Sequence, residues 1–212
     1  MHYIYLHGFA SSPNSTKAQY ILERFAQNQI KLEIPDLNCD DFYHLTITRQ
    51  LKQIGLLLEH KKDVTIIGSS LGGLSAAHIA EKFLQVKRLV LLAPAFGFLS
   101  HWLPTLTPEV IQRWQQEGYL MIHHYGEKRE LPLSYDFVVD ANQHQERFLQ
   151  RPIPTLILHG KHDEVIPIKA SQDFAQNRSW VELKELPSNH ALGDVMIEIW
   201  QAIAHFCHLP FV

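Results

Sequence analysis

Residues 64–72 read Val-Thr-Ile-Ile-Gly-Ser-Ser-Leu-Gly, and the helix-like stretch from Leu71 to Leu84 is rich in Gly, Ala and Ser. An apolar run of strand length therefore leads into G-x-S-x-G and then into a helix, the setting that gives this pattern a chemical meaning. A sharp turn there lifts the Ser70 hydroxyl clear of the sheet, and the positive end of the helix points into the same space. Ser70 is the predicted nucleophile.

Five further apolar runs have strand-like length, and helix-like patterns separate them along the chain. The six expected strands are Tyr3 to Leu6, Leu32 to Ile34, Val64 to Ile67, Leu89 to Leu92, Thr155 to Leu158 and Val181 to Leu186. Segments Ile47 to Leu58 and Val195 to Phe206 place apolar residues at near-helical intervals, and the small residues after Ser70 predict that helix to be the most buried. This alternation predicts an α/β fold, with a six-stranded parallel sheet and helices on both faces.

The segment 95–150 interrupts this alternation, because no convincing strand occurs in it. We expect a helical cap inserted over one end of the sheet, since so long a connection between strands is most simply a cover. Its helix-like pieces are Glu109 to Glu117 and Ser134 to Leu149. Trp102 and Trp114 are candidate substrate-binding residues in this cap. They could equally form its core, and composition does not separate the two.

A serine hydroxyl needs a base to take its proton, and the base needs a carboxylate behind it. In this strand–turn–helix setting the expected chain order is Ser, acid, His, with each residue after a strand. Asp163 follows the strand that ends at Leu158, and His190 follows the strand that ends near Leu186. They are the predicted acid and base. Other carboxylates that could replace Asp163 are Glu164, Asp136, Asp140 and Asp194, the last of which looks like a helix cap.

Negative charge develops on the substrate oxygen in this chemistry, and backbone amides are expected to hold it. His7-Gly8-Phe9 ends the first expected strand, and Gly8 lets the backbone come near a bound substrate. The second donor of such a site comes from a loop of this kind, next to the strand of the nucleophile. The amides of Phe9 and Leu71 are therefore the predicted oxyanion hole.

Fourteen histidines raise the question of a metal. The candidate spacings are His159-x-x-His162, His205-x-x-His208 and the pair His123-His124, but H-E-x-x-H is absent and no acidic or cysteine ligand completes a set. G-x-G-x-x-G does not follow a strand, and residues 68–73 lack the lysine of a phosphate-binding loop. We therefore expect no metal and no organic cofactor.

A length of 212 residues favours one domain, here 1–212 with the cap inserted. The 19 Lys and Arg against 22 Asp and Glu give a formal charge of −3, without a basic stretch that could bind along a nucleic acid.

The longest apolar run, Leu89 to Leu99, is too short to cross a bilayer, and the first residues do not form a signal peptide. Cys39 and Cys207 suit a reducing compartment, so we expect a cytoplasmic protein without membrane insertion.

The opening Tyr5-Leu6-His7-Gly8-Phe9-Ala10-Ser11-Ser12-Pro13-Asn14-Ser15-Thr16-Lys17-Ala18, followed by Ser70, Asp163 and His190 in that order, resembles the small bacterial YqiA/YcfP-like esterases of the α/β-hydrolase superfamily. The resemblance implies a reduced hydrolase fold that begins at the strand bearing the oxyanion loop. This reduced fold lacks the two strands that precede the strand of the oxyanion loop in larger members of the superfamily. The implied activity is hydrolysis of carboxylic esters, including acyl thioesters, on a small-molecule substrate.

The segment 95–150 departs from the compact members of that family and resembles the cap of larger esterases. Acyl chain length, leaving group and physiological substrate therefore stay open, as does the oligomeric state. The same three residues could also serve a carbon–carbon bond hydrolase or another acyl-transfer enzyme. A non-catalytic ligand-binding protein on this fold is the alternative outside enzymology.

Overall fold

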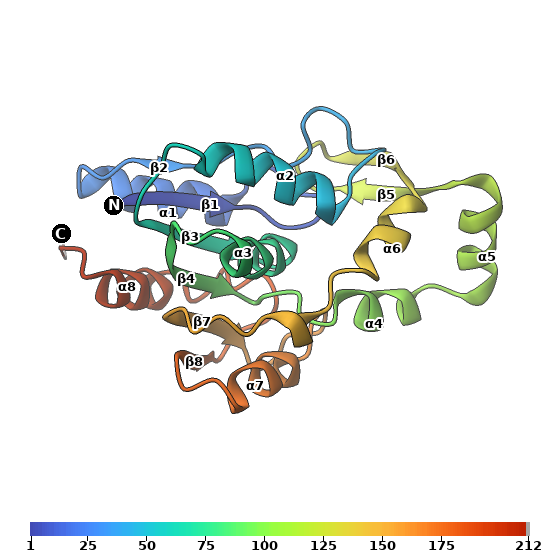
Figure 1. The fold of residues 1–212 in the computed structure, drawn as a ribbon. Helices are drawn as coiled ribbons and strands as arrows, with labels where there is room; N and C mark the ends of the chain where they lie inside the picture. The colour runs from blue at the N-terminus through green and yellow to red at the C-terminus, as the bar shows by residue number, and fades with distance from the viewer. Residues whose placement is uncertain (211–212) are drawn as a thin grey trace.

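A computed structural model describes residues 1–210 of the chain, and its centre is a six-stranded parallel sheet (Figure 1). The strands are β1 (His2–Leu6), β2 (Leu32–Glu33), β3 (Val64–Ser69), β4 (Val86–Leu92), β7 (Thr155–Gly160) and β8 (Val181–Leu186). They lie in the order β2-β1-β3-β4-β7-β8, and every neighbouring pair is parallel. The predicted six-stranded parallel sheet is confirmed.

Parallel pairing brings the carboxyl ends of the strands to one edge of the sheet. In the register of β1 and β3, Leu6 lies opposite Gly68, so the loop after β1 begins beside the turn that carries Ser70. The loops of Asp163 and His190 follow β7 and β8, which pair with each other at the other side of the sheet. All the predicted site residues outside the insertion therefore leave the sheet at the same edge.

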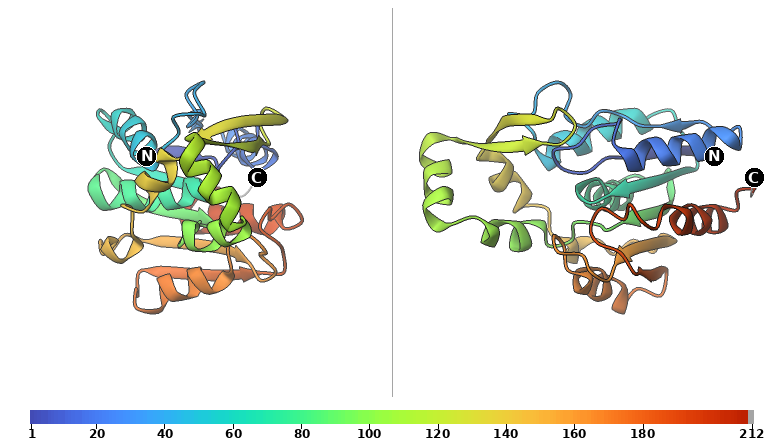
Figure 2. Two further views of the ribbon diagram at one scale, coloured as in Figure 1. Left: turned by 90° about the vertical axis from the view of Figure 1, so that its right-hand side faces the viewer. Right: turned by 180° about the vertical axis from the view of Figure 1, so that it is seen from behind.

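Helices cover both faces of the sheet, as predicted (Figure 2). Helices α1 (Thr16–Gln27) and α8 (Met196–Cys207) lie on one face, and α2 (Ile47–Leu58), α3 (Leu71–Lys82) and α7 (Ile168–Gln176) lie on the other. Two clusters of buried apolar side chains, one on each face, form the core. Helix α3 is buried at every position from Leu71 to Ala80, in agreement with the expectation from its small residues.

The insertion between β4 and β7 contains helices and also a β-hairpin. Its helices are α4 (Phe98–Trp102), α5 (Pro108–Glu117) and α6 (Asp136–Ala141), with 3-10 turns at Leu103–Thr105 and Glu146–Phe148. Antiparallel strands β5 (Tyr119–His124) and β6 (Arg129–Ser134) lie between α5 and α6. The expectation that segment 95–150 holds no strand is therefore wrong, and the helix expected from Ser134 to Leu149 is limited to α6 and a 3-10 turn.

The hairpin is difficult to predict from its sequence for two physical reasons. Pro132 lies inside β6, and proline removes a hydrogen-bond donor from a strand. It is tolerated here because a two-stranded sheet consists of edge strands only. Strand β5 begins with an apolar run, Tyr119 to Ile122, but it ends in His123 and His124 and is largely exposed or partly exposed, so it is not one of the fully buried strands that such runs mark in the central sheet.

The insertion stands at the carboxyl edge of the sheet, on the right of Figure 1, and the N-terminus and helix α8 lie on the left. Two backbone hydrogen bonds connect its hairpin to the loops after β1 and β2. The Tyr125 N–H donates to the Ala10 carbonyl at 2.8 Å, and the Ser134 N–H donates to the Tyr43 carbonyl at 2.9 Å. Within residues 1–210, no helix combines the length and the apolar composition needed to span a membrane.

Candidate active site

Ser70 lies at the turn between β3 and α3 in a backbone conformation that side chains rarely adopt, with φ 51° and ψ −119°. The turn requires glycine on both sides. A Cβ on Gly68 would lie 2.4 Å from the carbonyl oxygen of Gly72, and a Cβ on Gly72 would lie 2.3 Å from that of Leu6. Backbone strain of this kind persists only where the surrounding structure enforces it. Here the N–H of Ser70 donates to the Leu92 carbonyl at 2.9 Å, which ties the turn to β4.

The imidazole of His190 lies between Ser70 and Asp163. Its Nε2 is 3.0 Å from Oγ of Ser70, and its Nδ1 is 2.7 Å from Oδ2 of Asp163. With the ring hydrogen on Nδ1, the imidazole donates to the carboxylate and can accept the serine hydrogen at Nε2. The side chain of His190 is 20% exposed, whereas that of Asp163 is fully buried. The structure thus brings together three residues from three separate loops.

Four donors surround the carboxylate of Asp163. Oδ1 accepts hydrogen bonds from the N–H groups of Val165 at 2.9 Å and Ile166 at 2.8 Å. Oδ2 lies 3.0 Å from Nε2 of His159 as well as 2.7 Å from His190. Burial would raise the pKa of this carboxyl, but the hydrogen bonds from His159 and His190 and the attraction of His190 hold the pKa well below its usual range. Asp163 is therefore ionised wherever a histidine titrates.

His159, near the end of β7, contacts Asp163 in the candidate site, although the sequence indicated it only as a possible metal ligand. It is fully buried, with Nδ1 2.7 Å from Oγ of Ser171 and Nε2 2.9 Å from the Ile166 carbonyl oxygen. Its spacing partner His162 is exposed instead. A polar residue at the end of a buried apolar strand must find partners, and that signal could have marked His159. Within residues 1–210, no group of three or more possible metal ligands gathers.

The alternative carboxylates lie against other partners or in solvent. Asp194 accepts a hydrogen bond from the Ser188 hydroxyl, Asp140 accepts one from the N–H of Thr48 at 2.9 Å, and Glu164 and Asp136 are exposed. The expected capping role of Asp194 is not observed, because α8 begins after Val195 without a side-chain cap. Among these carboxylates, within the described residues, Asp163 alone contacts His190.

The amides of Phe9 and Leu71 both lie near Ser70. Leu71 follows it in the chain, and a Cβ on Gly8 would lie 3.3 Å from Cβ of Ser70. In the part of the chain that the structure describes, neither amide donates a hydrogen bond to another group. Leu71 is also the first residue of α3, where the helix dipole is positive. Two unpaired N–H groups beside a serine hydroxyl form a suitable site for a negatively charged oxygen.

His7 fixes the peptide group that carries the Phe9 amide. Its Nε2 accepts a hydrogen bond from the N–H of Leu37 at 2.9 Å, which leaves the ring hydrogen on Nδ1, 3.0 Å from the Gly8 carbonyl oxygen. The Gly8 carbonyl and the Phe9 N–H belong to one planar trans peptide and point in opposite directions. By holding the carbonyl, His7 therefore sets the direction of the predicted donor.

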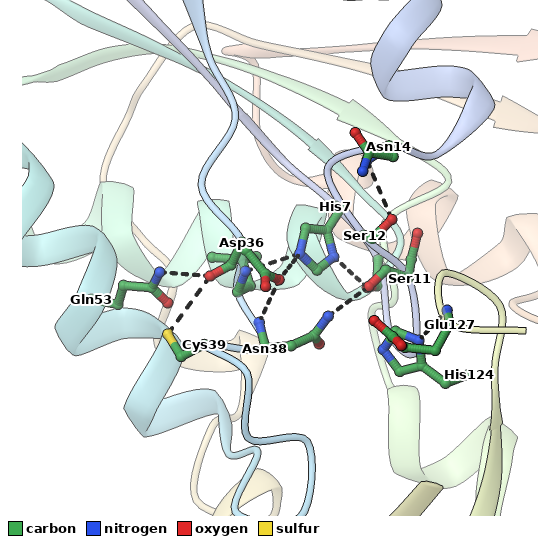
Figure 3. A network of polar contacts seen from close by, with 12 residues as sticks. His7, Ser11, Ser12, Asn14, Asp36, Asn38, Cys39, Gln53, His124 and Glu127 are labelled. Atoms are coloured by element: carbon green, nitrogen blue, oxygen red, sulfur yellow. Dashed lines mark hydrogen bonds and ion pairs between the residues drawn. The ribbon is translucent and has the colours of Figure 1, made fainter. Parts of the chain in front are cut away.

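The same polar network joins the loop after β1 to the loop after β2 (Figure 3). The side-chain amide of Asn38 donates to the Ser11 carbonyl at 2.7 Å. A cavity of about 510 Å³ opens beside this network, and its wall includes Ser12, Phe42 and His124. The cavity therefore lies between the loop that carries the predicted oxyanion donor and the hairpin of the insertion.

Aromatic side chains of the insertion meet at Phe9. The ring of Phe9 lies 5.2 Å from that of Trp102, which is partly exposed. Three further rings pack against Phe9: those of Phe42, Phe98 and Phe137. Trp114 is fully buried, and its indole N–H donates to the Leu133 carbonyl at 2.9 Å. Of the two candidate substrate-binding residues, Trp102 thus lies beside the Phe9 loop, whereas Trp114 belongs to the packed interior of the insertion.

Lys17, near the start of α1, contacts the residue before the candidate nucleophile. Its Nζ donates to Oγ of Ser69 at 3.1 Å. Burial lowers the pKa of this amine to about 8, although attraction to Asp163 acts in the opposite direction. Lys17 lies in the opening quoted above, but no residue pattern there indicated that its side chain would reach the turn of Ser70.

A family model described as an uncharacterised protein family, UPF0227, matches residues 2–207. This match confirms the resemblance to the small bacterial YqiA/YcfP-like proteins. No curated protein sequence matches the chain.

Solved structures of low sequence identity share the fold. A putative hydrolase from Agrobacterium vitis has a TM-score of 0.83 at 21% identity, over 97% of this chain and 87% of that one. Alpha/beta hydrolase domain-containing protein 10 from mouse has a TM-score of 0.80 at 20% identity, over 98% and 89%. Est1E from Butyrivibrio proteoclasticus has a TM-score of 0.74 at 21% identity, over 97% and 86%. The fold is thus that of the α/β hydrolases, as predicted.

Proposed function

The chain belongs to the uncharacterised protein family UPF0227, and we propose that it is a serine hydrolase that cleaves carboxylic esters or acyl thioesters. The observation that carries the proposal is the pair of contacts made by His190, at 3.0 Å to Oγ of Ser70 and 2.7 Å to the carboxylate of Asp163. These are the contacts that a base needs in order to activate a hydroxyl and to remain oriented while it does so.

In the proposed acylation step, Nε2 of His190 takes the hydroxyl proton as Oγ of Ser70 attacks the substrate carbonyl carbon. Negative charge moves onto the carbonyl oxygen, where the amides of Phe9 and Leu71 hold it. The carboxylate of Asp163 stabilises the protonated imidazole. His190 then gives its proton to the departing alcohol or thiol, which leaves an acyl group on Ser70.

Water completes the proposed cycle. His190 takes a proton from water, which attacks the acyl carbonyl in the same oxyanion hole. The bond to Oγ of Ser70 breaks, the proton returns to Oγ, and the carboxylic acid leaves. These steps need only the residues of the site and water, so no cofactor enters the proposal.

Two observations support an ester or thioester as the substrate. The unpaired amides of Phe9 and Leu71 suit the oxyanion formed from an acyl carbonyl. A structure of Est1E, which shares this fold, has ferulic acid bound, and ferulic acid is a carboxylic acid of the kind that ester hydrolysis releases. The cytoplasmic location expected from the sequence suits acyl-CoA as a thioester substrate.

Hydrolysis of p-nitrophenyl and CoA esters of increasing acyl length tests the proposal, in parallel with labelling by a fluorophosphonate probe. We expect wild type to cleave members of the series and to carry the probe on Ser70, and Ser70→Ala to lose both, with kcat lower by at least about 10,000-fold. Ser179→Ala is the matched control, because Ser179 is exposed and follows α7 at the far end of the sheet. It should behave as wild type.

The outcomes separate the alternatives. Labelling of Ser70 without cleavage of any ester or thioester would favour a carbon–carbon bond hydrolase or another acyl-transfer enzyme on the same residues. Absence of the adduct from folded wild-type protein would contradict the proposal and favour a non-catalytic binding protein.

A further inference from the structure

We propose that His159 is a positioning residue, which holds the carboxylate of Asp163 in the direction that His190 requires. The proposal rests on the function proposed above, because it assigns a role in the same site. Its basis is a chain of buried contacts that continues behind the acid: Ser171 to His159, and His159 to Asp163.

The contacts of His159 fix where its ring hydrogen lies. Nε2 faces two oxygen atoms that can only accept, Oδ2 of Asp163 at 3.0 Å and the carbonyl oxygen of Ile166 at 2.9 Å. The hydrogen must therefore be on Nε2, where it is donated to the Ile166 carbonyl, and the same N–H group lies against Oδ2 of Asp163. Nδ1 is then free to accept the hydroxyl hydrogen of Ser171, at 2.7 Å. Ser171 thus holds the ring in the orientation in which Nε2 faces Asp163.

The contact with His159 completes the surroundings of Asp163. Two backbone N–H groups hold Oδ1, whereas two imidazoles share Oδ2. The side chains of His159 and Asp163 are both fully buried, so water does not provide a substitute donor. Without His159, Oδ2 would keep His190 as its one side-chain donor, and rotation of the carboxyl group would meet less resistance.

The charges that face this carboxylate determine how the loss of His159 would be detected. His190 contacts Oδ2 directly, and the amine of Lys17 attracts Asp163 from α1. The donor from His159 disperses part of the negative charge on Oδ2. Removing this donor leaves more charge facing His190, which favours the protonated imidazole. A base that holds its proton more strongly becomes active only at higher pH.

A histidine that served the core alone would need only its bonds to Ser171 and Ile166. The 3.0 Å contact of Nε2 with Oδ2 of Asp163 is the feature that connects His159 to the chemistry. His159→Gln and His159→Leu separate the two roles, because the side-chain amide of glutamine can place a donor near the position of Nε2 and leucine cannot. His162→Leu is the matched control, since His162 is exposed and makes no side-chain hydrogen bond within residues 1–210.

The experiment measures the pH dependence of kcat/KM, with kcat and KM, on p-nitrophenyl acetate. For His159→Leu we expect kcat to fall by roughly 10- to 100-fold, the size expected for a lost hydrogen bond to a charged group. KM should change little, and the acid limb should move to higher pH. His159→Gln should retain most of kcat and the wild-type acid limb, and His162→Leu should match wild type.

Equal losses in His159→Gln and His159→Leu, or an unshifted acid limb in a folded His159→Leu protein, would overturn the proposal. If His159→Leu does not fold, the variants Ser171→Ala and His159→Gln test the positioning role of His159 instead. Ser171→Ala should lower kcat and move the acid limb in the same direction while His159→Gln does not, and a Ser171→Ala protein identical to wild type would contradict the inference. Fluorophosphonate labelling of wild type distinguishes this failure from failure of the proposed function, because labelling depends on Ser70 whatever His159 does.

Discussion

Ser188, two residues before His190, donates its hydroxyl hydrogen to the carboxylate of Asp194, which follows His190 by four residues. Asp194 is thus close to the base in sequence, yet it is bound to a different partner. Asp163, which is 27 residues from His190, is the carboxylate at Nδ1. The two carboxylates therefore make a matched pair of positions for testing which acid serves His190.

Asp163→Asn should lower kcat on a reactive ester by roughly 10,000-fold, because an amide cannot stabilise the protonated imidazole and favours the wrong tautomer. Asp194→Asn should leave kcat within about threefold of wild type, since it changes only the partner of Ser188. Steady-state kinetics on both variants, with thermal unfolding to verify folding, makes the comparison. A larger loss in Asp194→Asn than in Asp163→Asn would contradict the assignment of the acid.

The activity of the proposed hydrolase should depend on pH through a histidine. His190 must be neutral to take the proton of Ser70, so kcat/KM should fall toward acid pH, where a protonated imidazole cannot act as the base. Asp163 should add no second acid limb above about pH 4, because its pKa is held well below its usual range. A rate profile from about pH 4 to 9 checks this. A flat profile would exclude His190 as the base.

The sequence was most informative where one local signal had one structural solution. The apolar runs of β3 and β4 are buried on both sides. The G-x-S-x-G turn brings backbone atoms so close to Gly68 and Gly72 that no side chain fits at either position. The insertion was less predictable. Its hairpin contains Pro132 and is stabilised by bonds to distant loops, such as that from Ser134 to Tyr43, which no local pattern encodes.

The same distinction applies to the site. Ser70, Asp163 and His190 follow strands in an order that the fold dictates, so their positions could be read along the chain. The roles suggested for His159 and Lys17 depend on contacts across the fold, to Ser171 on α7 and to Ser69 on β3. Sequence spacing alone presents His159 as half of a metal-like pair, and only the three-dimensional partners separate it from His162.

Trp102 and Trp114 should respond differently to truncation. Trp114 is fully buried and its indole N–H is bonded, so Trp114→Ala should lower stability by about 3–5 kcal/mol without a specific change in substrate preference. Trp102 is partly exposed beside Phe9, so Trp102→Ala should open space near the candidate oxyanion loop and favour longer acyl chains. Thermal unfolding and the acyl-length series test this pair. An unchanged chain-length preference in Trp102→Ala would assign Trp102 to packing alone.

Gly72→Ala should be among the most destabilising single substitutions in the chain. Its Cβ would lie 2.3 Å from the carbonyl oxygen of Leu6 and 2.5 Å from that of His7, so α3 would have to move away from β1. We expect a loss of about 3 kcal/mol or more in the free energy of unfolding. Gly193→Ala is the control, because nothing lies within 4 Å of its added Cβ, and it should change stability by less than about 1 kcal/mol. Equal stabilities in denaturant would refute the close approach of α3 and β1.

Lys17 should make the stability of the protein depend on pH in the alkaline range. Its pKa is about 8 in the folded protein, below the ordinary value of 10.5. Between these values the unfolded chain keeps the proton that the folded chain has lost, so the unfolded state binds more protons and the contribution of Lys17 to stability rises with pH.

Lys17→Met removes this titration, whereas Lys52→Met removes an exposed lysine of α2 and serves as the control. Thermal unfolding at about pH 7 and about pH 9.5 should show wild type gaining stability relative to Lys17→Met as pH rises, because only wild type has a buried amine to deprotonate. The difference in thermal stability between wild type and Lys52→Met should be the same at both pH values. A difference between wild type and Lys17→Met that did not change with pH would mean that the amine is hydrated in solution, and the bond to Ser69 would then not keep it out of water.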